Sequence, residues 1–349
     1  MFSSLPFNYM FLLMMGIGTI FSVSSVHWLG IWAGLEINMI GFVPILIYQK
    51  SVSETESAVK YFIMQALGSG LLVFSSLITF STSFTWDLYS SLGFKNMSMM
   101  ILVISLLVKM GMFPFHYWLP SVMAGLPWFS CLLLATWQKL APLFLLLCLT
   151  ELNILYSLVI LLALIGVGSS LIGGIGGVNQ TQIRALLAYS SIAHLGWMMF
   201  ALLHGEWGLK SYLGLYITVS ICLFMTLWYS DSKLMKNIGG SKISNSYQMV
   251  VMLFFLSLAG LPPLLGFIPK WSVIMMGTNS TWISLILLLI LGSLLSLFYY
   301  LSLFFSLFLS SFKKYEMVLL VDNKLISLMI TLNILGGIFI MIMNLLNNM

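Results

Sequence analysis

The sequence predicts an all-α membrane protein, a polytopic bundle of about 11 transmembrane helices. Of its 349 residues, 60% are hydrophobic and only 7% are charged, against about 25% charged in an ordinary soluble domain. The mean hydropathy is +1.07 over the whole length. Apolar runs of about twenty residues, long enough to cross the ~30 Å hydrocarbon core, follow one another along the chain. The alternation of period two that is typical of membrane β-barrel strands is not found.

The predicted spans are joined by short connections, none long enough to hold a catalytic domain. They are expected near residues 7–26, 28–48, 57–80, 98–118, 126–149, 153–177, 181–203, 210–230, 248–272, 281–310 and 325–346. The tenth is overlong, so we expect it to tilt or to continue along the membrane interface. We therefore predict a single transmembrane domain over 1–349, in which the spans of 7–80 precede two halves at about 98–230 and 248–346.

Proline and glycine interrupt two of these spans. About sixteen residues of the fourth span precede Pro114, and the thirteen residues 248–260 of the ninth precede the run LPPLLGFIPKW at 261–271. Short, interrupted spans at corresponding positions of two halves indicate a transport site. The two spans lie five apart in the predicted order, so they cross the membrane in opposite senses. This spacing predicts an antiporter-like inverted repeat with two broken helices.

Four charged residues lie within the predicted spans or at their breaks: Glu36, Lys109, Lys139 and Lys270. Each charge at mid-membrane costs about 2.5–3.5 kcal/mol on insertion scales. The alternative to burial in the membrane is snorkelling, in which a long side chain reaches back to the interface. It suits Lys270, but Lys109 and Lys139 lie ten or more residues from the starts of their spans, and Glu36 is too short. We therefore predict that these residues face a hydrated interior path and exchange protons.

A lysine in such a place is suited to proton transfer, because burial favours its neutral form and a nearby carboxylate favours its charged form. Glu36 is the only carboxylate within the predicted spans, and the sequence leaves open which lysine it contacts. His116 and His194 are candidate relay residues, since histidine exchanges protons near neutral pH. The alternative for each histidine is a hydrogen-bonded core residue.

Other motifs exclude several kinds of site. Cys131, Cys148 and Cys222 lie in apolar segments without metal-ligand spacing. The glycines of 171–180 do not follow the spacing of nucleotide-binding loops, and Gly173 and Gly177 predict a close helix contact instead. We expect no metal and no bound cofactor, because no cluster of residues suits flavin, haem or an iron–sulfur centre.

The basic residues predict the orientation. With the N-terminus on one side of the membrane, nine loop lysines and arginines fall on that side and only two, Lys95 and Lys210, on the other. This asymmetry places the N-terminus in the cytoplasm or the mitochondrial matrix and the C-terminus opposite. The net charge of +5 therefore reports topology and does not suggest a nucleic-acid partner. The N-terminus has neither a secretory signal nor an Arg-rich presequence.

Several motifs in order resemble the NADH dehydrogenase subunit 2 family, the mitochondrially encoded, antiporter-like membrane subunits of respiratory complex I. They are WAGLEINM (32–39), VKYF (59–62), KMGMFPFHYWLP (109–120), TWQKLAP (136–142), GGVNQTQIRALLAYSSIAHLGWMM (176–199) and GLPPLLGFIPKW (260–271). The resemblance covers about 28–272, and the residues beyond match in hydropathy alone. It implies the shortened animal form of the family, in the mitochondrial inner membrane.

The resemblance also implies roles for particular residues. Glu36 and Lys109 match the family's Glu–Lys pair, Lys139 its central lysine, Lys270 the lysine of its second broken helix, and His116 and His194 lie along the same axis. NADH, flavin, iron–sulfur clusters and ubiquinone would be handled elsewhere in the complex, with other membrane-arm subunits as partners. Two alternatives stay open at this point: a subunit of a multisubunit cation/proton antiporter, and a structural membrane scaffold subunit.

Overall fold

The computed structural model of the chain confirms the all-α class. The residues that it describes are 7–47, 51–88, 96–152, 156–230, 245–278, 282–312 and 330–338. In these ranges no strand forms, and the single β-type pairing is a bridge between His27 and Asp87. Seven helices there are long and apolar enough to cross a membrane. The total of about 11 spans stays a prediction.

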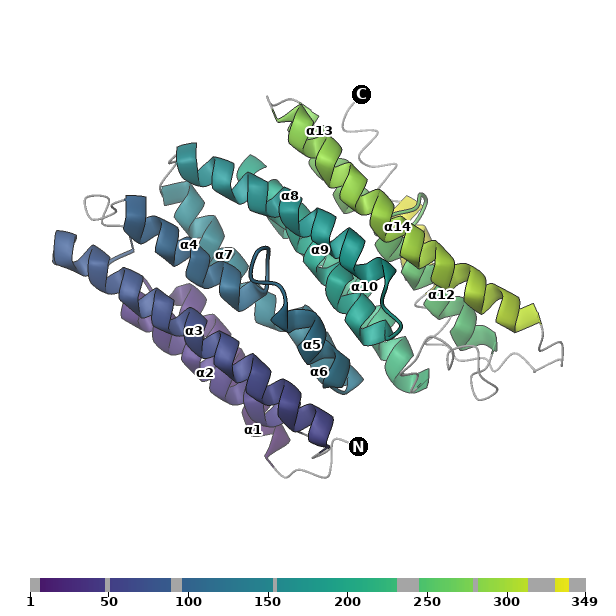
Figure 1. Cartoon of the computed structure of the whole chain (residues 1–349), viewed down its shortest axis with the longest axis horizontal. Helices are drawn as coiled ribbons and strands as arrows, with labels where there is room; N and C mark the ends of the chain where they lie inside the picture. Colours follow the sequence, from purple (N-terminus) through teal and green to yellow (C-terminus); the bar gives the residue numbers. More distant parts are fainter. Residues whose placement is uncertain are drawn as a thin grey trace. The chain divides into compact units, whose positions relative to one another are not determined.

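The chain forms two compact units, residues 1–161 and 162–349, each taken here by itself. The first contains α1 (Asn8–Ser24), α2 (Trp28–Leu46), α3 (Val52–Ser83), α4 (Asn96–Met110), α5 (Trp118–Gly125), α6 (Trp128–Ala135) and α7 (Trp137–Leu152). In Figure 1, α1, α2 and α3 lie side by side within this unit. The predicted repeat halves at 98–230 and 248–346 stay a prediction.

Small residues bring α1 and α2 into backbone contact. A methyl group on Gly18 would lie 2.5 Å from the backbone nitrogen of Asn38, and one on Gly34 would lie 2.5 Å from that of Ser22. Glycine at such positions allows two membrane helices to approach closely. The helix that carries Glu36 is thereby fixed against its neighbour.

The second unit contains most of α8 (Tyr156–Val178), together with α9 (Ile183–His204), α10 (Glu206–Ser230), α12 (Asn245–Ala259), α13 (Phe267–Thr278), α14 (Ile283–Phe312) and a helix over 330–338. The predicted glycine contact of α8 is confirmed. A methyl group on Gly173 would lie 2.7 Å from the backbone nitrogen of Ala193 on α9, and one on Gly177 would lie 2.6 Å from the ring of Tyr299 on α14.

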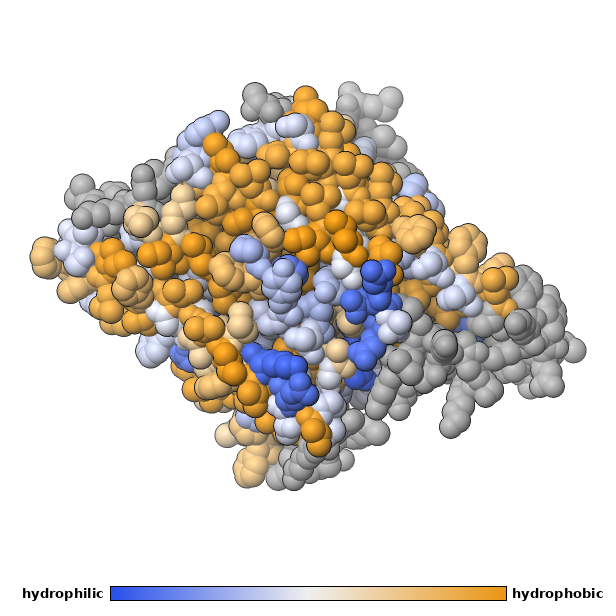
Figure 2. Space-filling view, in the orientation of Figure 1, coloured by the Kyte–Doolittle hydropathy of each residue, from blue (hydrophilic) through white to orange (hydrophobic). Residues whose placement is uncertain are grey.

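The outer surface suits a lipid environment. Large apolar side chains are exposed along several helices, among them Leu13, Ile20 and Phe298. Figure 2 shows a face that is largely apolar, with hydrophilic residues gathered in limited patches. Contiguous exposed apolar surface of this extent marks a membrane or protein interface rather than a water-facing one.

Both predicted helix breaks are confirmed. α4 ends at Met110 and α12 at Ala259, and the next residue in each case is a glycine with positive φ, 71° at Gly111 and 85° at Gly260. Glycine adopts this left-handed conformation without the steric cost that other residues carry, so it ends a helix readily. The chain resumes as α5 after the first break and as α13 after the second.

A third interruption was not predicted. The continuous span expected at 126–149 is divided into α6 and α7 at Thr136, whose φ and ψ are −114° and −69°. The Thr136 hydroxyl donates to the carbonyl oxygen of Leu132 at 2.7 Å. Pro142 has no N–H to donate to the carbonyl of Gln138, which loosens the first turn of α7. The predicted span is confirmed as one membrane-spanning candidate over Trp128–Leu152, with Lys139 directly after its interruption.

Candidate functional site

The four membrane charges lie in the two units separately, Glu36, Lys109 and Lys139 in the first and Lys270 in the second. The exposed fractions of the three lysines are 5% for Lys109, 4% for Lys139 and 7% for Lys270. A lysine that snorkels keeps its ammonium group in the aqueous interface. Burial of this degree contradicts snorkelling, including for Lys270, where the sequence allowed it.

Lys109 occupies the last turn of α4, directly before the break. Helix α3 provides its seat: the Gln65 side-chain amide donates to the Lys109 carbonyl oxygen at 3.1 Å. A methyl group on Gly68 would lie 2.8 Å from Lys109 Cγ, so the bare backbone of α3 makes room for the lysine stem. The two contacts hold both the backbone and the side chain of Lys109.

Glu36 is half-buried on α2. Its carboxylate lies close enough to Lys109 and to Tyr61 to act on both electrostatically, although no ion pair joins Glu36 and Lys109 in the described part of the chain. A charge that acts on a lysine without a direct contact still alters the lysine's proton affinity. Lys109 is thus one of the groups that the Glu36 carboxylate influences.

Lys139 lies in the first turn of α7, and its backbone N–H donates to the Thr136 carbonyl at 3.3 Å. The residue before it, Gln138, forms two hydrogen bonds with Asn38 on α2, at 2.9 and 3.1 Å. Helices α2 and α7, which carry Glu36 and Lys139, are therefore joined by a polar contact inside the first unit.

His116 lies in the segment between α4 and α5 and is 4% exposed. Its Nδ1 atom is 3.2 Å from the Pro114 carbonyl oxygen, and its ring centroid is 4.1 Å from that of Tyr117. The structure therefore places His116 in the first broken helix, a few residues beyond Lys109.

Lys270 in the second unit is held by the end of the broken helix α12. Its ammonium nitrogen donates to the carbonyl oxygens of Leu258 at 3.2 Å and Ala259 at 2.8 Å. The C-terminal carbonyls of a helix carry partial negative charge and favour a cation. A methyl group on Gly260 would lie 3.1 Å from the same nitrogen, so the glycine at the break also makes room for the amine.

His194 and Lys270 line one small cavity of about 10 Å³, roughly the room that one water molecule needs. His194 Nδ1 lies 2.9 Å from the Tyr212 hydroxyl. The buried hydroxyls of Tyr299 and Tyr300 also line the cavity, together with Ser190 and Ser296. This arrangement is suited to holding a water.

Several polar residues of these sites were not predicted: Asn38, Gln138, Tyr61, Tyr299 and Tyr300. In the sequence, each of them is a polar side chain within an apolar span. This signal is weaker than that of a charged residue, because amides and hydroxyls cost less free energy to bury. Arg184 is a further correction. This arginine is one of the nine basic residues assigned above to loops on the side of the N-terminus, but it lies in the first turn of α9 and is only 9% exposed.

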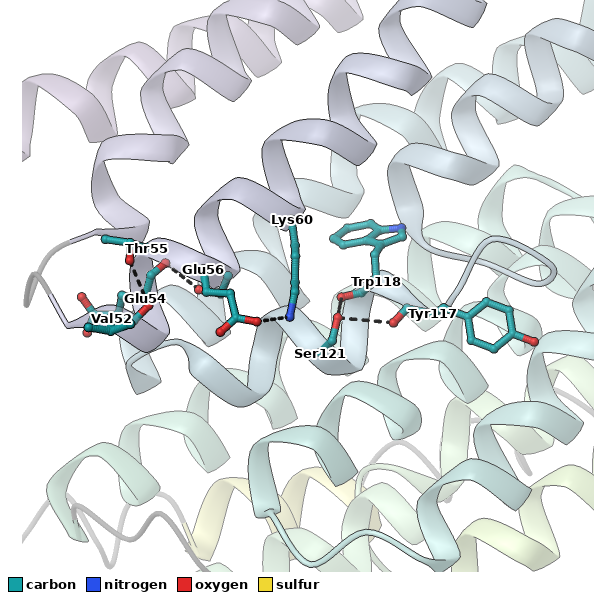
Figure 3. A network of polar contacts seen from close by, with 9 residues as sticks. Val52, Glu54, Thr55, Glu56, Lys60, Tyr117, Trp118 and Ser121 are labelled. Carbon is teal, nitrogen blue, oxygen red and sulfur yellow. Dashed lines mark hydrogen bonds and ion pairs between the residues drawn. The ribbon is translucent and has the colours of Figure 1, made fainter.

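The lysine of the VKYF motif has a different environment. Lys60 forms an ion pair with Glu56 one turn earlier on α3, at 2.6 Å, and its side chain is 45% exposed. Figure 3 shows this pair near Ser121 and Trp118 of α5. An exposed pair of this kind contributes little to stability, so Lys60 serves as a natural comparison for the buried lysines. Among the described residues, no three His, Cys, Asp or Glu side chains converge as metal ligands do.

Comparison with known proteins identifies the family of the chain. The membrane family described as "NADH:quinone oxidoreductase/Mrp antiporter, TM" matches residues 25–296. NADH-ubiquinone oxidoreductase chain 2 of Lumbricus terrestris is 40% identical over 82% of this chain and 83% of that protein. The chain 2 protein of Anopheles gambiae is 37% identical over 95% of this chain and 96% of that protein.

Solved structures extend the likeness to the fold. A chain of respiratory complex I from Thermus thermophilus, solved with bound aureothin, superposes with a TM-score of 0.81 at 25% identity, over 95% of this chain and 78% of that one. A chain of the Mrp complex from Dietzia sp. superposes with a TM-score of 0.77 at 15% identity, over 84% of this chain and 59% of that one, which shows a shared fold. The chain belongs to the NADH-ubiquinone oxidoreductase chain 2 family, and with it to the NADH:quinone oxidoreductase/Mrp antiporter membrane family.

Proposed function

We propose that this chain is a proton-translocating membrane-arm subunit of NADH–ubiquinone oxidoreductase. It moves protons through Glu36, Lys109, Lys139 and Lys270, with His116 and His194 as relay residues. The energy comes from redox reactions in other subunits, which hold NADH, flavin, iron–sulfur clusters and ubiquinone. The relatives at 37–42% identity, all named chain 2 of this oxidoreductase, favour this function over a stand-alone antiporter.

The observation that carries the proposal is the position of the lysines. Lys109 lies beside the helix break of the first unit, and the Lys270 amine lies beside the helix break of the second. Lys139 follows the interruption at Thr136. Broken helices inside a membrane free backbone carbonyls that need protein or water partners. Each buried amine is therefore next to backbone that can hold water, which suits an exchange of protons at each amine.

The proposal includes a location and an orientation. The protein would be a multi-pass protein of the mitochondrial inner membrane, as expected for a partner of the other membrane-arm subunits. Its N-terminus would face the matrix and its C-terminus the intermembrane space, because the nine-to-two excess of basic residues follows the positive-inside rule.

Replacement of Lys109 tests the function. Lys109→Met keeps the apolar stem and removes the amine, so the complex should assemble while proton pumping per NADH oxidised falls. Lys109→Arg should also fail, because a guanidinium stays protonated. Lys60→Met is the matched control, since it removes an exposed lysine from the neighbouring helix α3. The measurement is the rate of vesicle acidification divided by the rate of NADH oxidation.

The controls also separate the alternatives. If the assembled Lys109→Met complex pumps as well as the Lys60→Met complex, Lys109 is no relay and the scaffold alternative gains. If the purified chain does not migrate with an NADH-oxidising assembly but transports cations alone, the antiporter alternative is correct.

A further inference from the structure

The two amide side chains that join α2 to α7 form a reciprocal pair. Asn38 Nδ2 donates to Gln138 Oε1 at 2.9 Å, and Gln138 Nε2 donates to Asn38 Oδ1 at 3.1 Å. The Tyr61 hydroxyl of α3 donates to the same Gln138 oxygen at 3.4 Å. Three helices of the first unit thus meet in one hydrogen-bonded cluster, which we call the amide clamp (Asn38, Gln138 and Tyr61).

The amide clamp connects the elements that carry the proposed proton carriers. Asn38 follows Glu36 by two residues on α2, and Gln138 directly precedes Lys139 on α7. Tyr61, buried on α3, lies within the electrostatic reach of Glu36. The clamp therefore joins the helix that carries Glu36 to the helix that carries Lys139.

Amide chemistry suits a fixed spacer between groups that change charge. Asparagine and glutamine neither gain nor lose a proton at ordinary pH, and each offers both a donor and an acceptor. Paired reciprocally, they satisfy each other in a buried setting where an unmade hydrogen bond is costly. Their contact therefore stays the same whichever neighbouring lysine carries the proton.

We propose that the amide clamp is a positioning device, which holds Lys139 at the distance from Glu36 and Lys109 that proton transfer between them requires. This inference rests on the proposed function. It assigns Asn38, Gln138 and Tyr61 no proton of their own to transfer. Their contribution is the relative placement of α2, α3 and α7.

A set of paired substitutions tests the clamp in the assembled complex. Asn38→Leu and Gln138→Leu each break the reciprocal contact, and each should lower pumping per NADH by about tenfold to a hundredfold, since a misplacement of about 1 Å can cost about a hundredfold. Exchanging the two residues, Asn38→Gln with Gln138→Asn, preserves the summed length of the pair and is designed to allow both amide hydrogen bonds to re-form. The exchanged variant should pump within about twofold of the original chain, by the same reasoning.

The double variant Asn38→Leu with Gln138→Leu separates positioning from packing. Replacing both amides by apolar groups of similar shape restores packing between α2 and α7, and of the clamp only the Tyr61 hydroxyl loses its acceptor. We expect this variant to assemble fully and still to pump poorly. Full pumping by the double leucine variant would show that the amides only pack helices and would overturn the inference. The same conclusion would follow if the exchanged variant assembled but did not pump.

The variant Lys139→Met, measured in the same way, distinguishes a failure of the clamp from a failure of the proposed proton path. If Lys139→Met pumps normally, the proposed path through Lys139 is wrong and the clamp has nothing to position. If Lys139→Met fails while both single leucine variants pump normally, the path stands and only the clamp is refuted. If the single leucine variants do not assemble, the exchanged and double leucine variants decide the question.

Discussion

A single methyl group at Gly68 should disturb proton pumping without unfolding the protein. In the structure, a Cβ atom at this position would lie 2.8 Å from Cγ and 3.5 Å from Cε of Lys109, and 3.4 Å from the Ser105 carbonyl oxygen. Carbon atoms in contact prefer a separation of about 3.5–4.0 Å. The Lys109 stem must therefore move by about 1 Å, because the new methyl group is fixed to the helix and the stem is not.

The cost to stability is expected to be small. Overpacking a buried site costs about 1–3 kcal/mol, and alanine in place of glycine inside a helix returns about 1 kcal/mol. The net destabilisation is therefore about 0–2 kcal/mol. The functional cost should be larger, because a displacement of about 1 Å in a group that transfers protons can lower a rate by about a hundredfold. Gly68→Ala should thus give an assembled complex with strongly reduced pumping.

Gly70→Ala is the matched control on the same helix. A methyl group there meets no atom within 4 Å, so the variant gains the same helix propensity and leaves Lys109 in place. Both variants would be purified as intact complexes and compared by vesicle acidification per NADH oxidised. Equal pumping by the two assembled variants would refute the argument that the seat of Lys109 on α3 sets its function.

Three further predictions concern the second helix break, the coupling of Glu36 to Lys109 and the orientation of the chain. Gly260→Ala should lower both the thermal stability of the complex and its pumping, because alanine at φ 85° is strained by about 1–2 kcal/mol and its methyl group would press on Lys270; unchanged inactivation temperature and pumping would contradict this. Glu36→Gln and Lys109→Met together should reduce pumping by much less than the sum of their separate effects if the residues act as a pair, whereas additive losses would point to another partner for Glu36. An N-terminal tag should be accessible from the matrix and a C-terminal tag from the intermembrane space; two tags on one side would show an error of one in the number of spans.

The sequence by itself determined the class of the protein, the two helix breaks and the identity of the buried lysines. These features depend on local properties of the chain. An apolar run of sufficient length prefers the bilayer wherever it occurs, and a proline or a glycine ends a helix through its own backbone. A lysine among apolar residues is anomalous in any fold, which is why Lys109, Lys139 and Lys270 could be identified before their surroundings were known.

Only the tertiary structure decided which groups meet. The influence of Glu36 on Lys109, the seat of Lys109 on Gly68 and the reciprocal pair of Asn38 with Gln138 depend on how helices are rotated and how closely they approach. Hydropathy along a membrane helix does not specify its rotation, which is set by packing against neighbouring helices. The interruption at Thr136 was missed for a related reason, because its signal, Pro142, lies six residues further along the chain. Lys270 likewise needed the folded chain to bring its ammonium group to the carbonyls of Leu258 and Ala259, eleven and twelve residues earlier.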